Sequence, residues 1–518
     1  MPTQLIRDLI AANEGNEPET FQFLTENEPG INWFQHLFSI DLRALSTLRI
    51  ALGIISILFV FNQFSYIEML YTDRGILSRA HNQQILGDGF WSLLWFSGSI
   101  DVARVILIFA GLVAGVFALG YQTRLMNFVL LVLIWSIQVR NPLVLTGGDV
   151  LLRMMLFWCL FLPTNITWSI DAAQLEARPN SWKIASIGTV GIMAQVVFMY
   201  FFTGLAKLNP FWMNGDAVAY AMNLEMSVKP LGVWLQGYPW VMWLASIATL
   251  IAEIMTLFVM FIPRIFHFNR GVMLGFFVFL HLGILITMSI GLFSLTALAA
   301  WVIFIPTDIW NTFWGTPVGF SEKRFFRFET LWFEKLLKIA GTVFLGYITL
   351  QNVVFAMGPE VSSRLQVVQL FGRSTMTIQQ FHMFAEPPLY SPWFEYNAQL
   401  DSGQRVDIFY PERQDLQEKP ESVYRYMQNQ NWRRIHWNLI THPKYPPETE
   451  LVYREVRRRL LKHIVKQWNK ANIDDTVLTA ELVCHLDPIV IEKGPEDQVF
   501  SQHQSYDMTW ARYQDESQ

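Results

Sequence analysis

The chain has 518 residues, of which 52% are hydrophobic and only 16% are charged, and it contains 41 Phe and 20 Trp. This composition is typical of a membrane protein, whose helices face lipid and whose aromatic residues gather at the headgroup layers. The formal net charge of -5 argues against nucleic acid as a partner. The two cysteines, Cys159 and Cys484, have neither the pattern of a disulfide framework nor a metal-ligand spacing, so we expect no metal.

Residues 1–40 are polar, acidic and aromatic, unlike a cleavable signal peptide, and we assign them to a cytoplasmic N-terminal segment. Apolar runs follow at 44–61, 105–119, 125–139, 149–163, 184–206, 240–262, 271–290, 291–306 and 338–357. They predict an all-α polytopic membrane domain over residues 41–357 with about nine transmembrane helices. Several runs are shorter than the roughly 20 residues of a straight crossing, so we expect some helices to be tilted or broken.

Loop charges predict the orientation. If the nine runs alternate in direction, the following Lys and Arg fall on one side: Arg124, Arg178, Lys183, Arg264, Arg270, Lys323, Arg324, Arg327, Lys335 and Lys338. An excess of positive charge marks the cytoplasmic side. We therefore expect a multi-pass protein of the inner (plasma) membrane, with a cytoplasmic N-terminus and with Lys207 and the C-terminal region outside.

From about Gly358 the apolar runs shorten and charge rises. Trp393–Tyr410 reads as two strands around an Asp401–Gly403 turn, and Val477–Val483 and Pro488–Ile491 read as further strands. Glu450–Asn469 has helical spacing of apolar residues with basic residues between them. Residues 358–518 are therefore predicted to form a small extracytoplasmic α+β domain, whose basic helix either faces solvent or contacts the membrane surface.

Lys207 is the most informative residue of the membrane domain. The run Ile184–Ala206 carries no charge, and Lys207 follows directly. An amine held in apolar protein can lose its proton and act as a base, whereas a lysine at the end of a span can also extend to the headgroups. Gly204 permits a close helix contact, and Phe211 and Trp212 with Asp216 are placed to cover the amine.

The segment Arg140–Arg153 is a second candidate site. It places Asp149 at the mouth of a span and Arg153 one helical turn further on, so these two side chains share a helix face. Charges within a span usually line the protein interior. Two interpretations stay open: an ion pair that locks neighbouring helices, or a polar floor of a substrate pocket formed with Arg140 and Asn141.

Glu253 and His281 are further ionisable residues deep in apolar runs. For Glu253 we expect a protonated carboxyl group that is hydrogen-bonded to a neighbouring helix. His281 is either a neutral imidazole that bridges helices or a group that transfers protons or orients a ligand.

Several segments together resemble the HTTM (horizontally transferred transmembrane) domain family, the bacterial relatives of vitamin K-dependent gamma-carboxylase, over about residues 40–440. They are Leu42–Gly53, Tyr71–Leu77, Arg140–Arg153, Trp168–Asp171, the Lys207 segment, the His281 segment and Phe381–Pro388. The resemblance implies that Lys207 occupies the place of the lysine that deprotonates vitamin K hydroquinone. It also matches His281 to a histidine of the carboxylase, and implies reduced vitamin K or another quinol as cofactor.

The chain departs from the carboxylase at one motif. Where the carboxylase has an Asn-His pair, this sequence has Gly147, Gly148 and Asp149. This difference weakens the prediction of glutamate carboxylation, a lyase reaction, and leaves quinol epoxidation or another lipid-linked reaction open. The catalytic residues predicted by the resemblance are Lys207 and His281, and the predicted substrate-binding residues are Arg140, Asn141, Asp149, Arg153 and Asp216.

Two hypotheses follow from the sequence. The first is a membrane enzyme that uses Lys207 as a base on a quinol-like lipid. The second is a non-enzymatic scaffold or assembly partner whose outer domain docks an extracytoplasmic protein. A buried cavity that joins Lys207 to His281 and opens to lipid would favour the enzyme, whereas packed side chains and a Lys207 among the headgroups would favour the scaffold.

Overall fold

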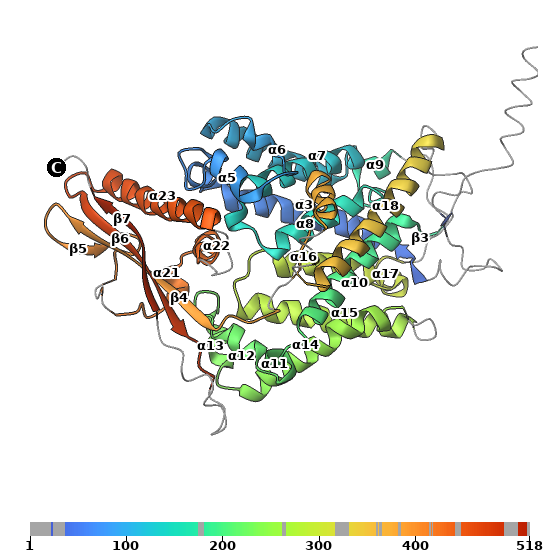
Figure 1. The fold of residues 1–518 in the computed structure, drawn as a ribbon. Coiled ribbons are helices and arrows are strands. Elements are labelled where there is room, and N and C mark those ends of the chain that lie inside the picture. Colours follow the sequence, from blue (N-terminus) through green and yellow to red (C-terminus); the bar gives the residue numbers. More distant parts are fainter. Residues whose placement is uncertain are drawn as a thin grey trace, which may run out of the picture.

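The computed structural model describes residues 22–23, 37–174, 181–261, 266–315, 331–358, 361, 365–381, 385–413, 416, 418–440, 447–491 and 506–514. Most of the predicted N-terminal segment 1–40 lies outside these ranges, as do several of the loop cations used to predict the orientation: Arg178, Arg264, Lys323, Arg324 and Arg327. The fold is mainly helical, with a small sheet near the C-terminus (Figure 1).

Seven described helices are long and apolar enough to cross a membrane. They are α3 (Leu42–Phe64), α6 (Ile100–Leu119), α7 (Thr123–Arg140), α10 (Ile187–Ala206), α14 (Pro239–Val259), α15 (Phe266–Thr287) and α18 (Leu331–Ala356). The number rises to eight if α16 (Phe293–Trp301) and α17 (Thr307–Trp314), which are bent by 93°, count as one broken span. Each of these helices corresponds to a predicted apolar run, apart from α17.

The remaining predicted run, 149–163, becomes α8 (Gly147–Cys159), a helix of only 13 residues. It is almost entirely buried and packs against α7, α10 and α16, so protein rather than lipid surrounds it. Because α8 and α16 are both short, the expected number of nine spans stays a prediction.

Short helices connect the long ones. They are α4 (Ile67–Tyr71), α5 (Arg79–Leu86), α9 (Ile170–Ala173), α11 (Pro210–Met213), α12 (Ala217–Met222), α13 (Pro230–Leu235) and α20 (Gln366–Ser374), with 3-10 turns at Leu93–Trp95, Pro142–Val144 and Val302–Phe304. Three short strands, β1 (Gln22–Phe23), β3 (Lys183–Ala185) and β2 (Ile40–Asp41), pair antiparallel in that order.

Local sequence explains where α10 begins and ends and where α11 begins. Ser186 caps α10 and forms a capping box with Thr189, which satisfies the free amides of the first turn. At the other end Lys207 is the C-cap, and Asn209 then begins α11 with Pro210 at its first position. The chain therefore turns directly after Lys207.

The C-terminal region contains a four-stranded antiparallel sheet in the order β5-β4-β6-β7. Its elements are β4 (Tyr390–Leu400), β5 (Arg405–Asp407), α21 (Val423–Tyr426), α22 (Gln430–Leu439), α23 (Pro447–Ala471), β6 (Val477–Pro488) and β7 (Tyr506–Gln514). The hairpin around Asp401–Gly403, the helix and the strand at Val477–Val483 are confirmed. A strand at Pro488–Ile491 is wrong, because Pro488 ends β6 and residues 489–491 are not in a strand.

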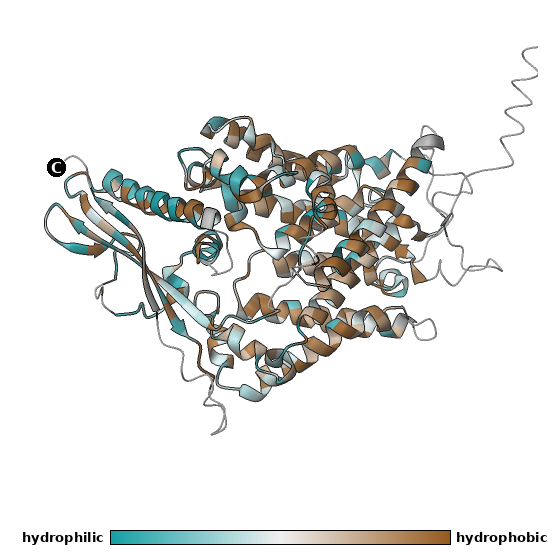
Figure 2. Ribbon diagram, viewed as in Figure 1, coloured by the Kyte–Doolittle hydropathy of each residue, from teal (hydrophilic) through white to brown (hydrophobic). Residues whose placement is uncertain are grey.

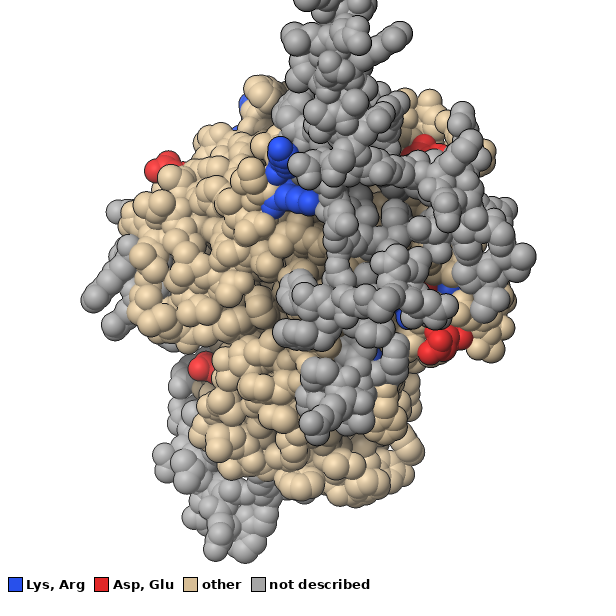
Figure 3. Space-filling view, turned by 90° about the vertical axis from the view of Figure 1, so that its right-hand side faces the viewer, with Lys and Arg blue, Asp and Glu red and all other residues tan. Residues whose placement is uncertain are grey.

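The sheet and the segment containing β3 and α17 lie at opposite ends of the helical bundle (Figure 1). Hydropathy follows the same division, because the long helices are largely hydrophobic whereas α23 and much of the sheet are hydrophilic (Figure 2). Figure 3 looks onto the end with β3 and α17, where the visible charged side chains are scattered among uncharged residues and grey segments.

His436 joins α22 to the sheet. Its Nε2 lies 2.7 Å from the Tyr396 hydroxyl, and its Nδ1 lies 2.7 Å from the Trp432 carbonyl oxygen. Because only a protonated Nδ1 can donate to the carbonyl, the neutral ring accepts from Tyr396. Complete burial lowers the pKa of His436 to about 4, although the bond to Trp432 raises it in part.

This burial predicts a pH dependence of the C-terminal domain. The pKa of His436 is lowered from 6.5 to about 4. At pH values between these two, the unfolded chain binds a proton at His436 that the folded chain does not bind, so the free energy of unfolding falls as pH falls through this window. The free energy of unfolding falls by about 3 kcal/mol. In a Cys159→Ala background, urea midpoints for labelling of the buried Cys484 thiol with a pyridyl disulfide measure this loss. A His436→Gln variant should lose this slope, and an unchanged slope would assign it to other groups.

Candidate functional site

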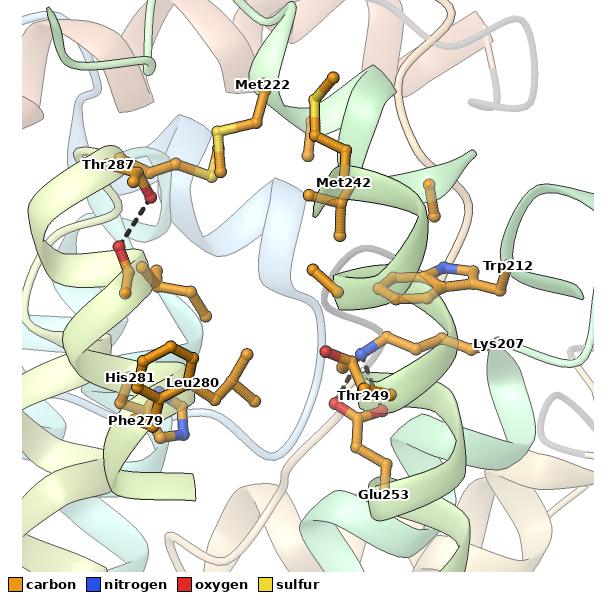
Figure 4. Close-up of a pocket in the computed structure, with 18 of the residues that line it drawn as sticks. Lys207, Trp212, Met222, Met242, Thr249, Glu253, Phe279, Leu280, His281 and Thr287 are labelled. Atoms are coloured by element: carbon orange, nitrogen blue, oxygen red, sulfur yellow. Dashed lines mark hydrogen bonds and ion pairs between the residues drawn. The ribbon is translucent and has the colours of Figure 1, made fainter. Parts of the chain in front are cut away.

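A cavity of about 460 Å³ lies among α10, α14 and α15, with α12 and α13 at one end. Figure 4 shows Lys207 and Glu253 on one side and His281 on the opposite side. Most of the wall is aliphatic, aromatic or methionine side chains, including Met199, Trp212, Met222, Met242, Phe276, Leu280, Met288 and Phe293. The polar residues in this wall are Tyr200, Thr203, Lys207, Thr249, Glu253, His281 and Thr287.

Lys207 is buried, with only 4% of its surface exposed. Its ammonium group donates to both carboxylate oxygens of Glu253, at 2.6 and 2.7 Å, and lies 4.4 Å from the centre of the Trp212 ring. The ring face adds a favourable cation–π contact. The expected cover by Trp212 is confirmed, and the interpretation of Lys207 as a lysine that extends to the headgroups is wrong.

Glu253 comes from α14, which packs closely on α10 at Gly204. A Cβ atom at Gly204 would lie only 3.0 Å from the Glu253 Cβ and from the Ile254 backbone nitrogen, so a larger residue would push the helices apart. The expected close contact at Gly204 is confirmed. The expected hydrogen bond between Glu253 and a neighbouring helix is confirmed, with Lys207 at the end of α10 as the partner. The protonation state expected for Glu253 stays a prediction.

His281 lies on α15 across the cavity. Its Nε2 is 2.5 Å from the Tyr200 hydroxyl oxygen, which also accepts a bond from the Trp301 indole at 3.0 Å. The Tyr200 hydroxyl is thus placed to donate to His281. The other ring nitrogen, Nδ1, is buried and has no hydrogen-bond partner among the described residues. His281 therefore bridges helices and also contributes to the cavity wall.

The five predicted substrate-binding residues do not line the cavity. Arg140 donates to the backbone oxygens of Leu77 and Thr72, at 2.9 and 3.0 Å, and Asn141 donates to that of Leu70 at 2.8 Å. Both side chains thereby fix the segment that follows α3. Asp216 is the residue before α12, outside the cavity wall.

Asp149 and Arg153 form no direct ion pair among the described contacts, so the pairing expected from their spacing is wrong. Asp149 accepts from the backbone and the hydroxyl of Thr146 and completes the capping box of α8. Arg153 donates to the Gln138 side chain at 2.8 Å and also to the Ile378 backbone oxygen. Binding of a substrate by these residues stays a prediction.

The spacing of residues in α10 is a sequence signal for part of this site. Tyr200, Thr203 and Lys207 are spaced by three and four residues, which places them on one face of α10. The pairing of Glu253 with Lys207 had no local signal, because it depends on how α14 is aligned with α10. Among the described residues, no group of three or more His, Cys, Asp or Glu side chains is placed to hold a metal ion.

Comparison with known proteins assigns the family. A family model for the HTTM domain matches residues 37–310, more than half of the chain. The chain belongs to the HTTM domain family. Searches of curated proteins and of solved structures found no match. The HTTM domain includes the cavity residues Lys207, Glu253 and His281, and the four-stranded sheet lies outside it.

The buried pair in the HTTM domain predicts a strong coupling between two mutations. Lys207→Met or Glu253→Met alone leaves one buried charge without its partner, which should cost about 3–5 kcal/mol. The double variant removes both charges and should cost much less. Unfolding of the four proteins in one detergent, arranged as a double-mutant cycle, measures the difference. Costs that simply add would show that the two groups do not depend on each other.

Proposed function

We propose that this HTTM protein is a membrane enzyme that removes a proton from the hydroxyl group of a quinol-like lipid, with Lys207 as the base and His281 orienting the ring. One observation carries the proposal: both residues are buried and line the same mainly apolar cavity. Its volume of about 460 Å³ suits a small ring system, since ligand pockets usually have 300–1,000 Å³.

Lipid access is supported by the outer wall of the cavity. Leu244 on α14 and Phe279 on α15 line the cavity although they are 51% and 77% exposed. The cavity therefore reaches the outer surface of two helices that are long and apolar enough to span a membrane. An apolar tail bound there would remain in the lipid while its polar ring reaches Lys207 and His281.

The resemblance to vitamin K-dependent gamma-carboxylase supplies the chemistry of this proposal. Reduced vitamin K or another quinol has an acidic hydroxyl group, and its anion can react with molecular oxygen to give the epoxide or can enter another lipid-linked reaction. We do not propose glutamate carboxylation, because Gly147, Gly148 and Asp149 stand where the carboxylase has Asn-His, and Asp149 is occupied in capping α8.

The orientation in the membrane is part of the proposal. The sheet and β3 lie at opposite ends of the bundle, which supports placing them on opposite sides of the membrane (Figure 1). From the loop charges we propose that the N-terminal side is cytoplasmic and that the sheet is extracytoplasmic, in the inner membrane. A reporter enzyme fused after Gln518 reads this orientation directly.

A scaffold would need no cavity between Lys207 and His281, so the cavity supports the enzyme over the scaffold.

Filling the cavity tests lipid binding. Gly283 lines the cavity, and a Cβ atom added there meets nothing within 4 Å, so Gly283→Phe should fold and place its ring in the cavity. We expect the purified variant to lose quinone or a related lipid that the unaltered protein retains, as measured by mass spectrometry of the extracted lipids.

Gly275 provides the matched control. It lies on the same helix, a Cβ atom there also meets nothing within 4 Å, and it does not line the cavity. Gly275→Phe should therefore retain the lipid. Equal retention by both variants would contradict binding in this cavity.

Replacement of Lys207 tests the base. Lys207→Arg keeps a positive charge that can pair with Glu253, but a guanidinium does not give up its proton in a protein. We expect the variant to insert and to retain lipid, while turnover of a quinol falls by about 10²-fold or more. Turnover at the original rate in purified Lys207→Arg would eliminate the base role.

A further inference from the structure

In its pair with Glu253, Lys207 is already protonated and cannot act as a base. Its nitrogen donates two hydrogen bonds to Glu253, an arrangement of an ammonium group and a carboxylate. An ammonium group has no lone pair with which to take a proton. Among the described contacts of Lys207, Glu253 is the group that can take one away.

Charge balance favours a pair over a lone amine in this cavity. If a neutral amine took a proton from a hydroxyl group, two charges would appear in apolar surroundings where none existed, which is costly. With Glu253 present, two charges exist before the reaction and two exist after it. One ion pair simply replaces another, so the low dielectric opposes the transfer far less.

We propose that Glu253 is the final acceptor of the substrate's proton and that Lys207 passes this proton on and then pairs with the substrate anion. The inference rests on the proposed function and extends it to a residue that the resemblance does not assign. The substrate O–H bond breaks, its electron pair stays on the oxygen, and a new O–H bond forms on the Glu253 carboxylate. Lys207 takes the proton as it gives another to Glu253, so it ends with the same number of protons.

The surroundings fit this transfer. Glu253 and Lys207 both line the cavity, and the close approach of the helices at Gly204 holds the two groups in contact. Trp212 offers its ring face to the ammonium group, which keeps the cation in place when the carboxylate becomes neutral. The other titratable side chains in the wall are Tyr200 and His281, which are hydrogen-bonded to each other.

Infrared difference spectroscopy tests the proposal on the full-length protein in detergent. The probe is 4-nitrophenol carrying a long alkyl chain, whose anion absorbs visible light. On binding to the unaltered protein, we expect the colour of the nitrophenolate together with a new band of a protonated carboxylic acid. Carbon-13 labelling of the glutamate side chains should shift this band. Glu253 is the carboxyl residue in the cavity wall, so Glu253→Gln should bind the probe without the band.

A second variant covers the case in which Glu253→Gln fails to fold. Glu253→Asp keeps a carboxyl group, and its band should respond to carbon-13 aspartate instead of glutamate. Nitrophenolate without a carboxylic acid band in the unaltered protein would overturn the assignment of Glu253 and leave Lys207 as the base. Failure of the proposed function looks different, because the probe would then not bind, or Gly283→Phe would bind it as well as Gly275→Phe does.

Discussion

The ion pair between Lys207 and Glu253 is the interaction on which the candidate site depends. Each charge is buried among apolar residues and would be strongly unfavourable alone, so each requires the other. Their contact joins the end of α10 to the middle of α14, and Gly204 allows the two helices to approach closely enough. A carboxylate and an ammonium group therefore face an otherwise mainly apolar cavity. Few other groups in the cavity wall can accept a proton.

Arg43 is also buried and pairs with the Asp41 carboxylate at 2.8 Å, but two other buried cations mainly bind backbone oxygens. Arg49 donates to the backbone oxygens of Thr164 and Trp168, at 2.7 and 2.5 Å, and Arg140 donates to those of Leu77 and Thr72. Carbonyl oxygens of irregular segments need donors where water is scarce, and a guanidinium group supplies several in fixed directions. A carbonyl cannot take a proton from arginine, so these contacts hold loops in place. Lys207 differs because both it and its carboxylate partner line the cavity.

The apolar runs were sufficient to predict the long helices, because a continuous apolar run of this length has few other stable structures. It also placed Lys207 at the end of α10 and His281 within α15, since both positions depend on one helix alone. Contacts between helices were not predictable in this way. Asp149 and Arg153 share a helix face but bond to Thr146 and Gln138, and Glu253 pairs across to α10. Such pairings depend on helix register and rotation, which a single sequence does not encode locally.

The cavity is also linked to the C-terminal region. The chain leading to β4 runs beside α10, where Gln379 bonds to Gln195 at 2.7 Å and the Phe381 carbonyl accepts from Thr203. Beyond it, Lys419 pairs with Glu225, which follows α12, at 2.9 Å, and with Asp487 of β6 at 2.6 Å. Because α10 and α12 both line the cavity, the sheet is attached to the helices that shape it. The C-terminal region is therefore in direct contact with α10, the helix that ends at Lys207.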